Sequence, residues 1–112
     1  MTDMWGYRNA TWTQGQDLVG YDVVATDGSI GTIDKATYDA SAAYVVVDTG
    51  FWIFGKKRLV PAGAIESVDH EAKDVRVAMT REQIKAAPDY DSDVLDEADR
   101  TRYGDYYRDY VR

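Results

Sequence analysis

The chain has 112 residues, of which 20 are acidic and 13 basic, with one histidine, no cysteine and a formal net charge of −7. This length supports a single domain with one small core, which leaves little chain for a deep substrate cleft. The lack of cysteine excludes a disulfide scaffold and thiolate chemistry. A negative surface repels phosphate groups, so nucleic acid is a disfavoured partner.

Residues 1–16 form an arm that carries Trp5, Tyr7 and Trp12 among polar residues. The arm has no apolar stretch of signal-peptide length. The longest apolar run, residues 42–47, is also far below the roughly 20 residues of a membrane-spanning helix. We therefore expect a cytoplasmic location, with peripheral membrane contact left open. Three large rings in a short arm favour docking, either on the rest of the chain or on a second chain.

Residues 17–80 hold six short segments of strand composition, separated by turn residues. The predicted strands are residues 21–26, 30–38, 43–48, 57–60, 65–69 and 74–79. Asp27-Gly28 predicts a two-residue type I′ turn after the first strand, and Gly31 predicts a bulge or a close backbone approach. Pro61 ends the fourth strand because it has no N–H for a central ladder. Together the segments predict a mainly β fold, a small six-stranded barrel that is closed or nearly closed.

Residues 81–112 change to a helical period, and residues 87–112 alone hold 8 acids and 4 bases, a net charge of −4. Thr80 and Gln83 have capping-box spacing, which predicts a short helix that ends by Pro88. A second helix is predicted over residues 94–103, with Gly104 as its interruption. Four tyrosines recur at the spacing of one helix face, namely Tyr103, Tyr106, Tyr107 and Tyr110. This stripe packs either on the chain's own barrel or on a neighbouring protomer.

Residues 51–58, Phe-Trp-Ile-Phe-Gly-Lys-Lys-Arg, place large apolar side chains directly before three bases. One interpretation is that half of the four large apolar residues plug one end of the barrel. The other is an exposed rim that contacts a protein partner or an anionic lipid surface, since tryptophan beside cations is typical of interface hot spots. The candidate contact residues are Trp52, Phe54, Lys56, Lys57 and Arg58.

The other candidate sites have weaker patterns. Residues 89–93, Asp-Tyr-Asp-Ser-Asp, are similar to the start of a calcium loop. An EF-hand needs glycine at its sixth position and glutamate at its twelfth, where this chain has Val94 and Arg100. His70 lies in a turn between two acids. Its spacing from other residues indicates neither a catalytic partner nor further metal ligands, so we expect a solvated side chain. The sequence thus predicts no catalytic residue, no metal ligand and no cofactor.

The glycines and aliphatic residues of the predicted strands resemble the PRC-barrel domain family, the small barrel shared by photosynthetic reaction-centre H subunits and ribosome-maturation factors. The matching residues are Leu18-Val19-Gly20, Val23, Asp27-Gly28, Gly31, Ile33, Tyr44-Val45-Val46-Val47, Leu59-Val60-Pro61 and Ile65. Residues 80–88 and the tyrosine-rich end look like the extension of bacterial stand-alone and stress-associated members. The resemblance covers about residues 17–90.

This resemblance implies a non-enzymatic adaptor that docks onto other proteins and onto itself, with a bacterial stress response as its setting. We expect a homodimer or a larger oligomer. The candidate self-association residues are Trp5, Trp12, Tyr103, Tyr106, Tyr107 and Tyr110. Two alternatives stay open. The chain is a module that binds a ligand or a divalent cation, or it is a docking factor for RNA or the ribosome.

Overall fold

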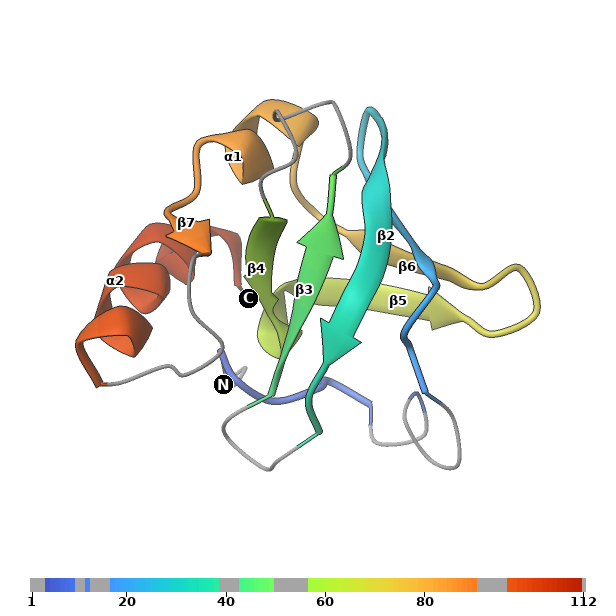
Figure 1. Cartoon of the computed structure of the whole chain (residues 1–112), viewed down its shortest axis with the longest axis horizontal. Coiled ribbons are helices and arrows are strands. Elements are labelled where there is room, and N and C mark those ends of the chain that lie inside the picture. The colour runs from blue at the N-terminus through green and yellow to red at the C-terminus, as the bar shows by residue number, and fades with distance from the viewer. Residues whose placement is uncertain are drawn as a thin grey trace.

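The computed structural model describes residues 4–9, 12, 17–38, 43–49, 57–90 and 97–111. These residues form a mixed, strongly curved sheet with two helices beside it (Figure 1). The strands are β1 (Asp22–Ala25), β2 (Gly28–Ala36), β3 (Tyr44–Asp48), β4 (Lys57–Pro61), β5 (Ile65–Asp69), β6 (Asp74–Val77) and β7 (Asp89–Tyr90). The helices are α1 (Arg81–Lys85) and α2 (Glu97–Tyr107), with 3-10 turns at Ala62–Ala64 and Arg108–Tyr110.

The strand order is β5-β6-β1-β2-β3-β4-β7, and the β1–β6 pair is parallel while the other pairs are antiparallel. In Figure 1, β5 crosses behind β3 and β2, so the sheet curls into a half-barrel. All six predicted strands are present, and each is within two residues of its predicted bounds. The mainly β fold, built on six strands at the predicted positions, is therefore confirmed. The two-residue β7 was not predicted, because so short a strand is recognisable only from its pairing with Lys57 and Arg58.

The β1–β2 hairpin is confirmed, but its predicted type I′ turn is wrong. Ala25 pairs with Gly28, so the turn residues are Thr26 and Asp27, and neither has a positive φ angle. Two hydrogen bonds fix this turn, one to the segment before α1 and one to the first residue of α1. The Thr26 N–H donates to the Met79 carbonyl at 2.9 Å, and the Asp27 Oδ1 accepts from the Arg81 N–H at 2.9 Å.

Gly31 lies where two backbones come into contact. Its φ angle is 150°, and a Cβ atom added there would lie 2.1 Å from the Asp48 carbonyl oxygen. A side chain at this position would therefore force β2 away from the end of β3. The predicted close backbone approach at Gly31 is confirmed.

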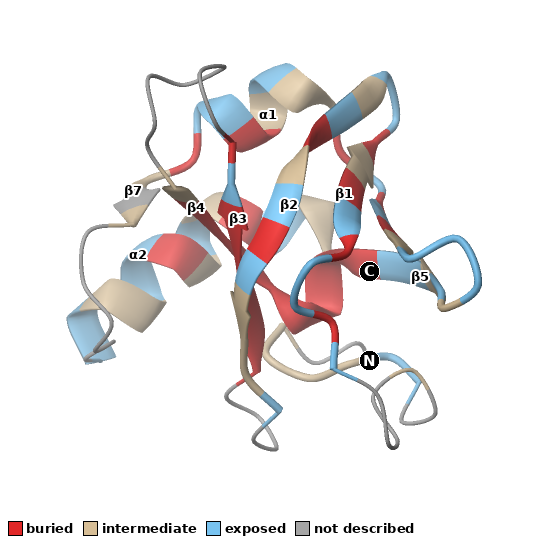
Figure 2. Ribbon diagram, turned by 45° about the vertical axis from the view of Figure 1, so that its right-hand side comes forward, coloured by how far each residue is buried: buried red, intermediate tan, exposed pale blue. Residues whose placement is uncertain are grey.

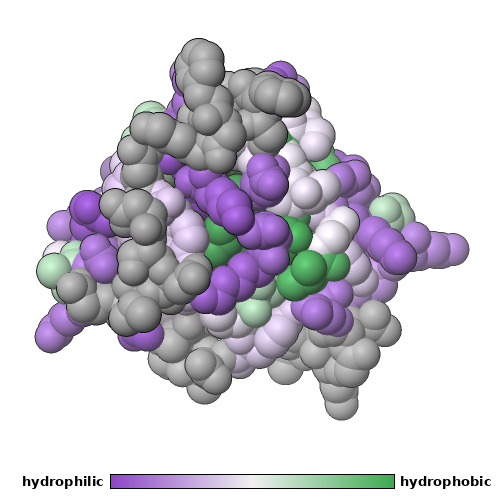
Figure 3. Space-filling view, viewed as in Figure 1, coloured by the Kyte–Doolittle hydropathy of each residue, from purple (hydrophilic) through white to green (hydrophobic). Residues whose placement is uncertain are grey.

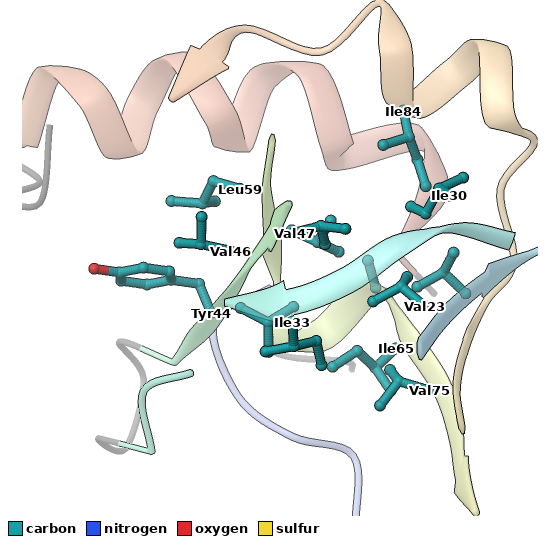
Figure 4. Packing of buried hydrophobic residues seen from close by; sticks show 14 of the residues in the cluster. Val23, Ile30, Ile33, Tyr44, Val46, Val47, Leu59, Ile65, Val75 and Ile84 are labelled. Atoms are coloured by element: carbon teal, nitrogen blue, oxygen red, sulfur yellow. The ribbon is translucent and has the colours of Figure 1, made fainter. Parts of the chain in front are cut away.

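The core lies on both faces of the central strands. Residues 44–47 of β3 and 58–61 of β4 are all buried, and Figure 2 shows this buried band in the middle of the molecule. In Figure 4, Val46 and Leu59 lie toward α2, whereas Val47, Ile33, Ile65 and Val75 lie on the side of the half-barrel. A near-continuous apolar run such as Val45–Val47 is expected for a strand that is covered on both sides.

Helix α2 supplies the second cover through two tyrosines. Tyr103 and Tyr107 are fully buried, and the Tyr107 hydroxyl donates to the Leu59 carbonyl at 2.7 Å. Burial raises the pKa of Tyr107, so its phenol remains a donor at any physiological pH. The hydroxyl thus satisfies a buried β4 carbonyl, as a neighbouring strand would otherwise do.

The predicted capping box is confirmed, because Thr80 and Gln83 bond reciprocally at the start of α1. The predicted interruption at Gly104 is wrong, because α2 continues through it to Tyr107. Glycine costs about 1 kcal/mol in a helix, but burial of a tyrosine ring contributes more than that. Tertiary packing of Tyr103 and Tyr107 therefore carries the helix past the glycine.

Two glycine substitutions should have opposite effects on stability. Gly31→Ala should destabilise the fold by about 2 kcal/mol or more, since its Cβ would overlap the Asp48 backbone. Gly104→Ala should stabilise it by about 0.5–1 kcal/mol. No atom lies within 4 Å of the added Cβ, and alanine favours the helical conformation more than glycine does. Urea unfolding followed by tryptophan fluorescence measures both, and equal effects of the two substitutions would contradict the assigned contacts.

The hydroxyl of Tyr107 should contribute separately from its ring. Tyr107→Phe keeps the ring in the core but leaves the buried Leu59 carbonyl without this donor, so it should cost about 1–3 kcal/mol. The same unfolding assay measures this loss. A variant as stable as the parent would show that another donor reaches the carbonyl.

Candidate interaction surface

Residues 4–9 of the predicted arm lie across one end of the half-barrel, below the ends of β2 and β3 in Figure 1. The Ala43 N–H donates to the Trp5 carbonyl and the Gly63 N–H donates to the Met4 carbonyl, each at 2.8 Å. The Arg8 Nε donates back to the Gly63 carbonyl at 3.3 Å. These bonds tie the arm to the start of β3 and to the turn after β4.

The rings of the arm add contacts to more distant segments. Trp5 packs edge-on against Tyr44 with ring centroids 6.5 Å apart, and the Arg100 guanidinium of α2 lies 5.9 Å from the centre of the Trp5 ring. Tyr7 stacks on Tyr38 at 5.9 Å. The Tyr7 hydroxyl also donates to the Thr37 carbonyl at 2.8 Å. Residues 4–9 therefore dock on the chain's own sheet, which is one of the two arrangements predicted for the arm.

Tyr38 is an exposed ring that is nevertheless fixed in place. Its hydroxyl donates to the Asp17 carboxylate at 2.5 Å and accepts from the Leu18 N–H at 2.9 Å. Partial burial and the hydrogen bond to Asp17 raise the pKa of Tyr38 to about 12, and the same bond lowers the pKa of Asp17. At neutral pH the phenol is therefore the donor and the carboxylate is ionised.

The two exposed large hydrophobic residues of the described chain lie close together at this point. Tyr38 is 43% exposed and Val19 is 47% exposed. They are joined through Asp17, whose Oδ1 also accepts from the Val19 N–H at 3.2 Å. By contrast, much of the surface visible in Figure 3 is hydrophilic. The arm thus crosses the molecule beside its most exposed apolar side chains.

The tail tyrosines divide into two classes. Tyr103 and Tyr107 are buried in the core of the same chain, so the structure has the intramolecular arrangement of the two that the sequence left open. Tyr106 and Tyr110 are half-buried and contact each other. The Tyr106 hydroxyl donates to the Gln83 carbonyl in the middle of α1. Trp12, the other ring predicted for self-association, is half-buried and packs against the core.

The predicted basic-aromatic rim is only partly described. Trp52, Phe54 and Lys56 lie outside the described residues. Lys57 is half-exposed and forms an ion pair with Asp34 of β2 at 2.5 Å. Arg58 does not belong to an exposed rim, because it is 4% exposed and donates to the Lys85 carbonyl at 3.0 Å. The carbonyls at the C-terminus of α1 need a donor, and this buried guanidinium supplies it.

Other polar residues take structural positions. His70 is half-buried rather than solvated, because its Nδ1 lies 2.9 Å from the Tyr21 hydroxyl and its ring packs edge-on against Tyr21. Of the predicted acidic cluster, residues 91–93 lie outside the described part, and Asp89 belongs to β7. In the described ranges, no three His, Cys, Asp or Glu side chains come together as metal ligands.

Sequence reasoning missed the contact set of Tyr38 and Asp17. These residues are 21 positions apart, and neither lies in a recognisable motif. Only the three arm rings signalled that this part of the molecule carries specific contacts. Arg100 on Trp5 was equally unpredictable, because it depends on where α2 lies relative to the arm.

Comparison with curated proteins gives no match. Among solved structures, one from Pseudomonas aeruginosa, assigned as a 16S ribosomal RNA processing protein RimM, aligns with a TM-score of 0.48 and 23% sequence identity. The alignment covers 58% of this chain and 42% of that chain, so this chain matches less than half of that protein. Neither helix in the described part of the chain is long and apolar enough to cross a membrane.

The family assignment rests on a separate and broader match. A family model, the PRC-barrel domain, matches residues 14–84. This range contains strands β1–β6 and nearly all of α1, which together form the half-barrel and its cap. The matched range also holds Gly31, whose contact with the Asp48 backbone gives β2 its place beside β3. The chain belongs to the PRC-barrel family.

Proposed function

We propose that this PRC-barrel protein is a non-catalytic adaptor that associates with itself and with another protein through its outer surface. A cytoplasmic location and a role in a bacterial stress response are part of the proposal. The observation that carries it is the position of the aromatic side chains outside the core. In the described chain, Trp5, Trp12, Tyr106 and Tyr110 each have one part on the core and another part accessible, and the Tyr38 side chain is 43% exposed.

Such rings suit protein interfaces. A half-buried aromatic ring presents a large apolar area together with a polar tip, and aromatic residues are enriched where proteins meet. Tyr38 is already immobilised by Tyr7, Asp17 and Leu18. A side chain fixed before binding loses little conformational entropy in a complex, so it contributes more of its contact energy to affinity.

Three groups of the described residues that could serve catalysis have structural partners. His70 is bonded to Tyr21, the Asp17 carboxylate to Tyr38 and the Tyr107 hydroxyl to the backbone of β4. A nucleophile and base within hydrogen-bond reach, oriented by a third group, would support an enzyme. The arrangement of these side chains favours a binding role for the described surface.

Self-association should raise the particle mass that is measured in solution. At high micromolar concentration, light scattering should give at least twice the 12.6 kDa of the single chain. Because the net charge is −7, copies repel one another, and salt should strengthen the association. Screening shortens the Debye length from about 30 Å at 0.01 M salt to about 3 Å at 1 M.

A particle of single-chain mass at both salt concentrations would contradict self-association. Titration with an RNA oligonucleotide distinguishes the RNA-docking alternative, because phosphate contacts weaken steeply as salt rises. Tight RNA binding with that salt dependence, shown by a monomeric chain, would replace the adaptor proposal. Calorimetric binding of a divalent cation below millimolar concentration would favour the cation-binding alternative in the same way.

A further inference from the structure

We infer that the site occupied by residues 4–9 also receives the same residues of a second copy, so that two chains exchange their arms. The inference rests on the proposed self-association and names the surface through which it occurs. The arm is held by the end of β2, the start of β3, the turn after β4 and helix α2. These four segments form the site that the arm occupies.

The contacts of the arm are of a kind that a second chain can supply equally well. They include two backbone hydrogen bonds, from the Ala43 and Gly63 amides, and two ring contacts, with Tyr44 and Tyr38. Exchange of an identical element between protomers keeps each of these contacts and changes only the chain that provides it. Exchange is therefore a low-cost route to a dimer.

The charge distribution favours the arm over the rest of the surface as the contact between two copies of the chain. Residues 1–16 contain one acid, Asp3, and one base, Arg8, so the whole net charge of −7 belongs to residues 17–112. Two such bodies repel each other, whereas a neutral arm with aromatic side chains meets no such repulsion. An exchanged arm bridges the bodies without requiring their acidic faces to pack together.

Two other surfaces of the described residues carry charges that oppose pairing. Strand β5 is at the end of the described sheet, but it carries exposed Glu66 and Asp69, and its register shifts between Ile65 and Ser67. Charges and bulges on an edge strand oppose pairing with another chain. The outward face of α2 carries ion pairs, such as Arg102 with Asp99. Each of these two surfaces therefore presents charged side chains to a second copy.

The exposed apolar residues lie beside the arm instead. Tyr38 stacks directly on Tyr7 of the arm, and Val19 is connected to Tyr38 through Asp17. An arm supplied by another protomer would bring that protomer close to Tyr38 and Val19. The exchanged dimer would thereby cover side chains that the single chain leaves 43% and 47% exposed.

Isotope-filtered NMR on an equal mixture of labelled and unlabelled full-length chains tests the exchange directly. The inference predicts nuclear Overhauser contacts between the Trp5 indole and the Tyr44 ring across differently labelled chains. Light scattering on the same sample gives the mass. If the sample is dimeric and these contacts arise only within one chain, arm exchange is wrong and self-association stands. If the sample is monomeric, both are wrong.

Two variants provide a matched comparison. Tyr7 and His70 are both half-buried, and each is held by a side-chain hydrogen bond, Tyr7 to the Thr37 carbonyl and His70 to the Tyr21 hydroxyl. Tyr7→Ala should weaken dimerisation at least tenfold, whereas His70→Ala should change it less than twofold. Thermal unfolding of both variants shows whether they are folded. Equal dissociation constants for folded Tyr7→Ala and the parent chain would overturn the inference.

Discussion

Burial of β3 and β4 on both faces is the constraint on which the rest of the molecule depends. A half-barrel of seven strands covers only one side of this pair, so the valines and Leu59 need a second cover. Helix α2 provides it with Tyr103 and Tyr107, and the Tyr107 hydroxyl also satisfies a β4 carbonyl. The C-terminal extension is therefore part of the core, although the family match ends at residue 84. A domain of this size has little apolar area to spare, and the extension supplies what the half-barrel lacks.

The arm and the extension complete the half-barrel in different ways. The extension places fully buried rings in the core, whereas the described rings of the arm are half-buried and lie at the surface. The arm is held by a few backbone hydrogen bonds and by edge-on or stacked rings. Segments with few buried contacts open with less free energy than core strands do. This difference is the reason why the exchange we infer involves the arm rather than the extension.

Much of the fold was predictable because its signals are local. The β-branched run Val45–Val47, the reciprocal bonds of Thr80 and Gln83, and the close approach at Gly31 all follow from neighbouring residues. What could not be predicted depends on partners far along the chain. Asp27 caps a helix that begins 54 positions later, which moves the hairpin turn. Arg58 bonds the end of α1 instead of facing solvent, and packing carries α2 through Gly104. Of the residues on the candidate surface, the sequence indicated only the three aromatic residues of the arm. Tyr38, Asp17 and Arg100 were not predicted, because tertiary contacts bring them to this surface.

Native-state hydrogen exchange tests most directly whether the arm is a separable ligand of a rigid half-barrel. The Ala43 and Gly63 amides donate to the arm, whereas the Val46 amide lies within the central ladder of β3. The account predicts that the Ala43 and Gly63 amides exchange through a local opening, at a free energy clearly below that of Val46. Exchange of all three amides only through global unfolding would contradict it, because the arm would then be inseparable from the core.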